Sequence, residues 1–123
     1  MRPDGGFLFT GRRMIEFAVS MPPSVNNLFL NVPGRGRVRS GRYRAWQDEN
    51  LWALKALKLG PVAGHVRVDY WLPVKNRQDI DNPLKALNDL LQSSGILAND
   101  KQIRQLWVDH ANRTDVLVKV TAL

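Results

Sequence analysis

The sequence predicts one α/β domain in which a mixed β-sheet packs against two helices. Three observations predict this class. A length of 123 residues suits a single domain with one core. Several short segments alternate between apolar and polar residues, as half-buried strands do, and two further segments have the apolar spacing of helices. The expected order along the chain is strand, basic loop, helix, strand, helix, strand, strand.

The first third of the chain is expected to hold a strand and a long basic loop. Residues 1–13 should form a flexible extension in front of a domain that spans 14–123. Alternation in residues 14–20, MIEFAVS, favours a strand. Residues 34–44, GRGRVRSGRYR, contain five arginines and three glycines and no acid. Because such a segment cannot build a core, we expect a flexible loop or an extended arm there.

The first helix is expected at residues 45–59, AWQDENLWALKALKL, where apolar residues recur at helical spacing. Asp48 and Glu49 would lie in its first turn, where the helix dipole favours negative charge. Gly60 and Pro61 would end it. The four tryptophans of the chain are expected to be core or interface anchors rather than platforms for nucleic-acid bases.

Three further strands are expected. Residues 65–72, HVRVDYWL, alternate strictly and predict a strand that Pro73 closes. Residues 103–109 and 115–121 predict the last two strands, with 111–114 as the turn between them. The side chains expected to point inward from the first of these strands are those of Val66, Val68, Tyr70 and Leu72.

The second helix is marked at both ends. It is expected at residues 83–94, with Asn82 as N-cap, Pro83 at the first helical position and Gly95 as the stop. Its buried stripe is expected to consist of Leu84, Leu87 and Leu91, with Leu90 alongside.

The charge of the chain restricts the class of partner. There are 18 Lys and Arg against 11 Asp and Glu, which gives a net charge of +7 and a pI near 10.4. This balance favours nucleic acid over a membrane, which would also need an amphipathic basic helix or a lipid anchor. The absence of cysteine excludes disulfides, thiolate metal sites and a cysteine nucleophile, and it agrees with a cytoplasmic protein. No apolar run approaches the roughly 20 residues that span a bilayer.

Against this basic background, four acids gather in one short stretch. Asp79, Asp81, Asp89 and Asp100 all fall within residues 76–102. In extended chain Asp79 and Asp81 would leave the same face, and two such carboxylates repel each other unless a cation lies between them. Mg²⁺ is held in this way, by one or two carboxylates together with waters and phosphate oxygens. The alternative is that the acids cap the following helix and stabilise its dipole.

Asp100 is a plausible third metal ligand, although distance limits how it can contribute. The helix at 83–94 would be about 18 Å long. The five residues from Ile96 to Asp100 could return only about 17 Å. Asp100 can therefore approach the other two acids only if the chain doubles straight back, or if it serves a neighbouring subunit. Lys85 lies in the first turn of the helix and could bind a scissile phosphate, and Asp89 is expected to be its structural partner.

The complete string DIDNPLKALNDLL, followed by GILANDKQ, resembles the RusA family of Holliday junction resolvases. That family has Asp-x-Asp-Asn, a lysine three residues later, a helix with an aspartate, and an Asp-Gln-type segment after a glycine. The early stretch PPSVNNLF also resembles a family element. The resemblance covers roughly residues 14–121 in order and spacing. One departure is Asn99-Asp100, where members often have two acids in tandem.

The resemblance implies both a site and an assembly. Asp79, Asp81 and Asp100 would be the catalytic acids that bind Mg²⁺, with Mn²⁺ as a substitute, and Lys85 would be the partner of the phosphate. The resemblance also implies a homodimer. A dimer would suit a four-way junction, because the junction is close to two-fold symmetric and needs two opposed cuts.

The arginines of the basic loop are expected to contact DNA phosphates. They are Arg35, Arg37, Arg39, Arg42 and Arg44, and Lys75 and Arg77 should continue the same positive surface. Few aromatic residues are interleaved with these charges. That argues against single-strand stacking and favours duplex or branched DNA recognised by its shape. A loop that only aids solubility is the alternative.

Three functions fit these patterns. The first is a Mg²⁺-dependent, structure-specific endodeoxyribonuclease that resolves Holliday (four-way) junctions by paired phosphodiester cleavage in recombination and repair. The second is a non-catalytic module that binds branched DNA and whose acids only cap and orient a helix. The third is a metal nuclease that acts on flaps or other branched DNA.

Overall fold

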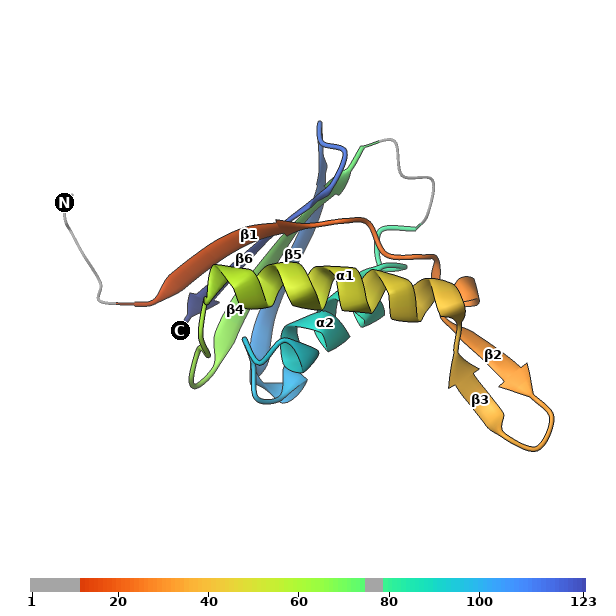
Figure 1. The fold of residues 1–123 in the computed structure, drawn as a ribbon. Coiled ribbons are helices and arrows are strands. Elements are labelled where there is room, and N and C mark those ends of the chain that lie inside the picture. The colour runs from red at the N-terminus through yellow and green to blue at the C-terminus, as the bar shows by residue number, and fades with distance from the viewer. Residues whose placement is uncertain (1–11, 75–78) are drawn as a thin grey trace.

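A computed structural model describes residues 12–74 and 79–123 (Figure 1). The expected extension at residues 1–13 therefore lies almost wholly outside the described residues. The strands and helices, in chain order, are β1 (Met14–Val19), β2 (Phe29–Val32), β3 (Gly36–Arg39), α1 (Gly41–Leu57), β4 (Val66–Pro73), α2 (Leu84–Ser93), β5 (Ile103–Ala111) and β6 (Val116–Ala122). Two short 3-10 helices, Val25–Asn27 and Asp100–Gln102, precede β2 and β5.

The main sheet has four strands in the order β1-β6-β4-β5. β4 and β5 run parallel and the other two pairings are antiparallel. This confirms the prediction of one α/β domain with a mixed sheet and two helices. The parallel pair is joined through α2. The chain therefore leaves the carboxyl end of β4 and must return to the opposite end of the sheet, where β5 begins. That crossover determines where the acids lie.

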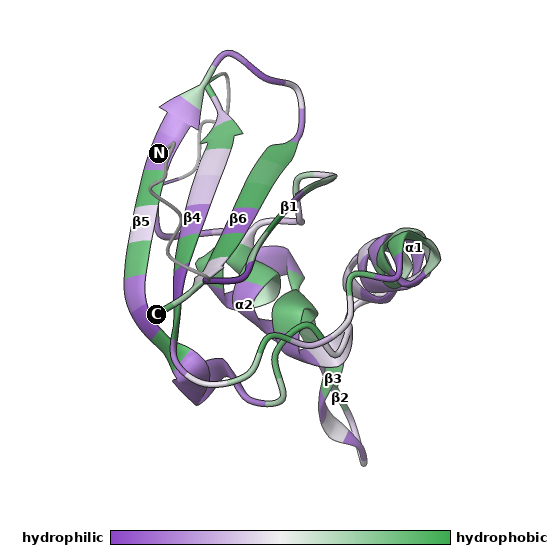
Figure 2. Cartoon of the chain, turned by 90° about the vertical axis from the view of Figure 1, so that its left-hand side faces the viewer, coloured by the Kyte–Doolittle hydropathy of each residue, from purple (hydrophilic) through white to green (hydrophobic). Residues whose placement is uncertain are grey.

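The core forms between one face of the sheet and the helices (Figure 2). The four residues expected to point inward from β4 are all fully buried, and Val116, Val118 and Val120 of β6 join them. From α2, Leu87, Leu90 and Leu91 complete this core. Each such side chain contributes roughly 1.5–3 kcal/mol of transfer free energy when it leaves water. The opposite face of β1 carries the exposed Glu16 and Ala18.

The basic segment 34–44 was expected to be a flexible loop or an extended arm, and the flexible loop is wrong. Its first half forms β3, which pairs with β2 as an antiparallel hairpin. Pro33 and Gly34 form the turn, with the amide of Arg35 donating to the carbonyl of Val32 at 3.0 Å. Gly34 has φ of 77°, which a type II turn requires at that position. Arginine and glycine thus build a defined ribbon, because hairpin pairing needs only backbone groups and a suitable turn.

Helix α1 begins at Gly41, four residues before the predicted start. Ser40 is its N-cap, and the Ser40 hydroxyl accepts a hydrogen bond from the amide of Tyr43 at 3.1 Å. The acids expected in the first turn, Asp48 and Glu49, therefore lie in the third. The helix also ends before the expected Gly60-Pro61 stop, at a left-handed Lys58 with φ of 53°.

Helix α2 lies where the sequence predicted it, but its N-cap differs. The residue at the cap is Pro83, which offers no side-chain hydrogen bond, and Asn82 instead bonds a distant segment. The stop is as expected, because Ser94 is followed by Gly95 with φ of 81°. No helix within residues 12–74 and 79–123 is long and apolar enough to cross a membrane.

The tryptophans do not share one environment. Trp46 is buried in the core, where its ring stacks 6.2 Å from that of Tyr43. Trp52 on α1 is 79% exposed, so it is not a core residue of the single chain, and its role as an interface anchor stays a prediction. Trp71 and Trp107 meet edge to face at 5.3 Å on neighbouring strands of the main sheet.

Candidate active site

The acids Asp79 and Asp81 lie beyond the carboxyl end of β4, in the connection that leads into α2. Backbone turns hold this connection, because the amide of Asn82 donates to the carbonyl of Asp79 at 2.9 Å and that of Leu84 to Asp81 at 3.2 Å. Both acidic residues are exposed. Among the residues that the structure describes, no hydrogen bond or ion pair engages either carboxylate. The two charges lie just before the positive end of the α2 dipole, which stabilises them.

Asn82 ties this connection to the early PPSVNN segment, far away in the sequence. Its side-chain oxygen accepts a hydrogen bond from the backbone amide of Val25 at 3.0 Å. In the early segment, the side-chain amide of Asn27 donates to the hydroxyl of Ser24 at 3.0 Å. The two stretches that carried the family resemblance are therefore in direct contact. Sequence reasoning gave Asn82 a local capping role, and no local signal points to this partner.

Lys85 lies in the first turn of α2, where its ammonium group is 3.7 Å from the carboxylate of Asp89. The expected helical pairing of these two residues is confirmed. The same carboxylate accepts a hydrogen bond from the hydroxyl of Tyr43 at 3.3 Å. Burial, and then the charge and hydrogen bond of Asp89, raise the pKa of Tyr43 to about 12. The Lys85 side chain remains 54% exposed, so its charge is available to a ligand.

A second tyrosine supports α2 from the sheet. The hydroxyl of Tyr70 donates to the side-chain oxygen of Asn88 at 2.8 Å. Burial and then the charge of Asp89 raise the pKa of Tyr70 well above its usual value, so the neutral donor form is maintained. Two tyrosines, one from α1 and one from β4, thus hold the middle of α2. Tyr70 was expected only to face the core, and Tyr43 lies in the segment expected to be a flexible loop or an extended arm, so neither was expected beside the site.

Asp100 lies at the other end of α2. Its amide donates to the side-chain oxygen of Gln92, in the last turn of that helix, at 3.1 Å. Asp81 precedes the first turn, and the ten residues between the two ends span about 15 Å. Because β4 and β5 are parallel, the residues after α2 must return to the amino end of β5. Within one chain, Asp100 is therefore separated from Asp79 and Asp81.

The described residues of a single chain do not gather three metal-ligating side chains at one point. Asp79 and Asp81 alone nevertheless have the right chemistry for a hard divalent cation, since they are exposed carboxylates two residues apart. Mg²⁺ commonly takes one or two protein carboxylates and completes its shell with waters and phosphate oxygens. The pair therefore fits such an ion as a partial site that is open to a further ligand.

The arginines expected to bind DNA lie on the hairpin and the first turn of α1, and all are exposed. The guanidinium of Arg37 lies 4.2 Å from the centre of the Phe29 ring, as in a cation–π contact. Arg39 donates to the side-chain oxygen of Gln47 at 2.5 Å. Arg35 is in the turn, and Arg42 and Arg44 are on α1. The expected DNA contacts of Lys75 and Arg77 lie outside the described residues.

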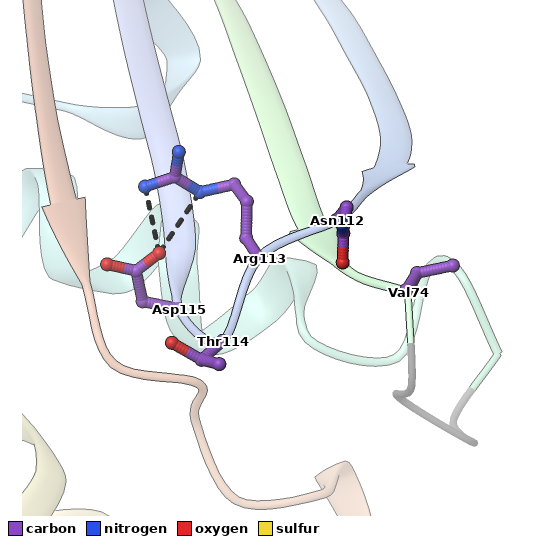
Figure 3. A pocket seen from close by; sticks show the side chains of 5 residues that line it. All are labelled: Val74, Asn112, Arg113, Thr114 and Asp115. Atoms are coloured by element: carbon purple, nitrogen blue, oxygen red, sulfur yellow. Dashed lines mark hydrogen bonds and ion pairs between the residues drawn. The ribbon is translucent and has the colours of Figure 1, made fainter.

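A cavity of about 400 Å³ opens at the same edge of the sheet, beside the end of β4 (Figure 3). Its described lining is Val74, Asn112, Arg113, Thr114 and Asp115. Two nitrogens of Arg113 engage one carboxylate oxygen of Asp115, at 2.8 and 3.0 Å. That pairing neutralises the one cation of the described lining. Asp79, Asp81, Lys85 and Asp100 are not among these lining residues, and the arrangement is that of a structural turn.

The fold and the site together define a class: a small basic α/β domain that presents exposed carboxylates at one sheet edge and an arginine hairpin. A protein-family model described as "Endodeoxyribonuclease RusA" matches residues 20–121. The chain belongs to the RusA family, which confirms the resemblance drawn from its motifs. It is also similar to a protein of Aquifex aeolicus (strain VF5) named "Crossover junction endodeoxyribonuclease RusA". The two are 28% identical over 93 residues, which cover 72% of this chain and 74% of the relative.

Proposed function

We propose that this protein is a divalent-metal-dependent endodeoxyribonuclease that resolves Holliday (four-way) DNA junctions by paired cuts in recombination and repair. The observation that carries the proposal is the exposed pair Asp79 and Asp81, held by backbone turns next to Lys85 in a RusA-family chain. The name of the Aquifex relative supports the substrate class. The net charge of +7 supports a polyanionic ligand.

Asp79 and Asp81 would hold the cation, Mg²⁺ or Mn²⁺. When bound, the ion would neutralise charge on the attacked phosphodiester and promote ionisation of the attacking water. Lys85 contributes a positive charge from the adjacent helical turn, aimed at a phosphate oxygen rather than at the metal. Asp89 orients Lys85 by its ion pair, and Tyr43 in turn restrains Asp89. Asp89 is thus a positioning residue, not a ligand.

The third acid, Asp100, would come from a second copy of the chain. In a single chain it lies at the opposite end of α2, beside Gln92. Two α2 helices that cross antiparallel about a two-fold axis bring the carboxyl end of each beside the amino end of the other. Each site would then combine Asp79 and Asp81 of one copy with Asp100 of its partner. Two such sites, related by the two-fold axis, suit the two opposed cuts of a junction.

Single amide variants test the metal assignment. Asp79→Asn, Asp81→Asn and Asp100→Asn should each lower the cleavage of a four-way junction by about 100-fold or more, because an amide is a poor ligand for Mg²⁺. Junction binding should stay within about threefold of wild type, since phosphate contacts dominate affinity. Lys85→Met should lower the cleavage of the junction by a similar factor. Asp48→Asn, an exposed aspartate on α1, is the matched control. Full cleavage by the first three variants would refute the assignment.

A second candidate is a non-catalytic module that binds branched DNA. The specific observation in its favour is that the described residues of one chain gather no three acids at one point. This candidate predicts salt-sensitive junction binding with no strand scission in Mg²⁺ or Mn²⁺. A panel of four-way junctions, flaps and plain duplex, each incubated with the wild type and either ion, separates this candidate from the nuclease. The panel also identifies a nuclease that prefers flaps.

A further inference from the structure

The β2–β3 hairpin has two unlike faces. Along β3, Arg37 and Arg39 alternate with Val38. The two arginine side chains therefore leave one face of the ribbon, and the Val38 side chain leaves the other. The register pairs Val38 with Leu30 and Arg37 with Asn31. One face of the hairpin is therefore basic and polar, and the other presents the apolar pair Leu30 and Val38.

The apolar face is open to solvent. Leu30 is 54% exposed, and it does not join the core cluster formed by the described residues. Val38 and Val32 are half-buried and Pro33 is exposed. The hairpin projects from the rest of the domain beyond the amino end of α1 (Figure 1). An aliphatic pair on a projecting ribbon has a cost in water unless a partner covers it.

The ribbon is firmly anchored at its base. Leu28 is fully buried, and the ring of Phe29 meets that of Tyr43 edge-on at 5.7 Å. The amide of Ser40 donates to the carbonyl of Leu28 at 2.8 Å, which closes the base of the hairpin. The two faces are thus held in fixed directions, as an element that inserts into a ligand requires.

The basic face lies on the side of the proposed site. Arg39 bonds Gln47 of α1, and Phe29 on the same face packs against Tyr43. Tyr43 reaches Asp89, the partner of Lys85. The basic face is therefore connected by direct contacts to the proposed active site, and the apolar face points the other way.

We propose that this hairpin is a wedge, in which Leu30 and Val38 pack against a base pair laid open at the branch point of a DNA junction. Arg37 and Arg39 on the opposite face contact phosphates of the neighbouring arm. This inference rests on the proposed function and adds to it the element that distinguishes a branch from plain duplex. Apolar side chains commonly insert at opened base steps, and the contacts they make there offset the cost of unstacking.

The charge around Leu30 and Val38 indicates which kind of ligand would cover them. Residues 29–39 hold three arginines and no acid, so an ordinary protein partner would have to be acidic and apolar together. DNA combines negative charge with an apolar surface, but that apolar surface is accessible only where a base pair lacks a stacking neighbour. In duplex the base faces are covered, and in a branch they are not. The occupant that fits is thus the exposed face of a base pair flanked by phosphates.

The test uses the full chain and a four-way junction with 2-aminopurine at the branch point. Wild type should raise the fluorescence on binding in Ca²⁺, which allows binding without cutting. The variant L30S/V38T should lose that rise and weaken junction binding by about tenfold, because stacking against one base is lost. Duplex affinity should stay within about twofold, since the phosphate contacts are intact.

Two further variants serve as controls for this test. Trp52→Ser removes a more exposed apolar side chain from α1 and should change neither quantity. Leu30→Phe enlarges the apolar face without adding charge, and it should increase the fluorescence and the preference for junction over duplex. That variant gives a gain of signal, which a misfolded hairpin cannot produce.

Several outcomes would overturn the wedge. L30S/V38T with unchanged fluorescence and affinity would do so while wild type still cleaves, and the proposed function would survive. A shift of that variant from dimer to monomer in light scattering would assign the face to a second copy. Binding of wild type, but not L30S/V38T, to phosphatidylserine vesicles would assign it to a membrane. A wild type that binds no branched DNA would remove both proposals.

Discussion

The acidic connection and the arginine hairpin hold their charges in opposite ways. Asp79 and Asp81 are fixed only through the backbone, and no described side chain engages their carboxylates. The hairpin arginines are restrained by side-chain contacts, with Arg37 over Phe29 and Arg39 bonded to Gln47. Restrained cations lose less conformational entropy when they meet phosphate. Carboxylates that no described side chain engages are ready for an external ligand.

Tyr43 connects the two regions by side-chain contacts. Tyr43 lies in the first turn of α1, packs against Phe29 of the hairpin and donates to Asp89 of α2. Lys85 shares that carboxylate. Under the proposed function the hairpin would position DNA and the acidic connection would carry the chemistry, and the contacts of the two regions meet at Asp89.

The largest expected effect comes from mixing two inactive variants. Asp81→Asn and Asp100→Asn chains should each fail to cleave, and mixed dimers should regain the ability to nick a junction. In the mixed dimer one site would carry both changes and the other would carry neither, if each site draws on both copies as proposed. Nicking should reach at least about 100 times the level of either variant alone. Strand-specific gels on premixed, refolded chains measure it.

If each site were complete within one chain, no mixture could contain an intact site. Absence of nicking by a verified mixed dimer would therefore contradict the shared site. A mixture of Asp79→Asn with Asp81→Asn is the control, because these two acids belong to the same half of the site. That mixture should stay inactive.

The next effect concerns the hairpin. Arg37→Gln with Arg39→Gln should weaken junction binding by about tenfold or more at physiological salt and lower the slope of log affinity against log salt by roughly 2. Each arginine is expected to neutralise about one phosphate. Arg104→Gln, an exposed arginine on β5, is the control and should leave affinity almost unchanged. An unchanged salt slope in the double variant would remove the hairpin from the DNA interface.

A smaller effect is expected from Asn82→Ala. This change removes the acceptor for the Val25 amide and frees the acidic connection from the early segment. The lost hydrogen bond is worth about 1 kcal/mol, so we expect a several-fold fall in the cleavage rate at saturating junction and little change in Kd. Asn112→Ala, after β5, is the control. Equal losses in rate and affinity would indicate general unfolding instead.

The smallest effect concerns pH. The pKa of Tyr43 is raised from 10.0 to about 12 in the folded chain. Above pH 10 the unfolded chain loses this proton first, so stability is complete below about pH 10 and falls as pH rises toward 12. Tyr43→Phe has no proton to lose and should show a shallower fall. Urea midpoints at pH 8 and 11 measure this, and parallel falls in both proteins would argue against the linkage.

The sequence predicted most of the main sheet because its strands alternate strictly. Val66 to Leu72 show a clean period of two, and α2 has both an amphipathic stripe and a glycine stop. The hairpin escaped prediction because both strands are short and β3 is rich in arginine. Two signals were nevertheless present: Pro33-Gly34 between two extended stretches, and Ser40 as a helix cap. The prediction of a flexible loop or an extended arm rested instead on the arginine and glycine content of residues 34–44.

The candidate site was only half accessible from the sequence. Asp79 and Asp81 were correctly expected in front of α2, because Pro83 and Gly95 mark that helix clearly. The location of Asp100 depends on β4 and β5 being parallel, and strand periodicity does not distinguish parallel from antiparallel pairing. The Asn82 contact and the tyrosines on Asp89 and Asn88 are long-range, so no local pattern reports them.

Ser40 is the only residue between the last strand of the hairpin and the first turn of α1. Its amide and hydroxyl donate to the carbonyls of Leu28 and Asn27, while the same hydroxyl caps α1. The ribbon beyond it is therefore a module whose length can change without disturbing the domain. Adding two residues to each strand would lengthen its reach by about 7 Å and keep both faces. Adding one to each would exchange them, so viable relatives should vary this ribbon in even steps.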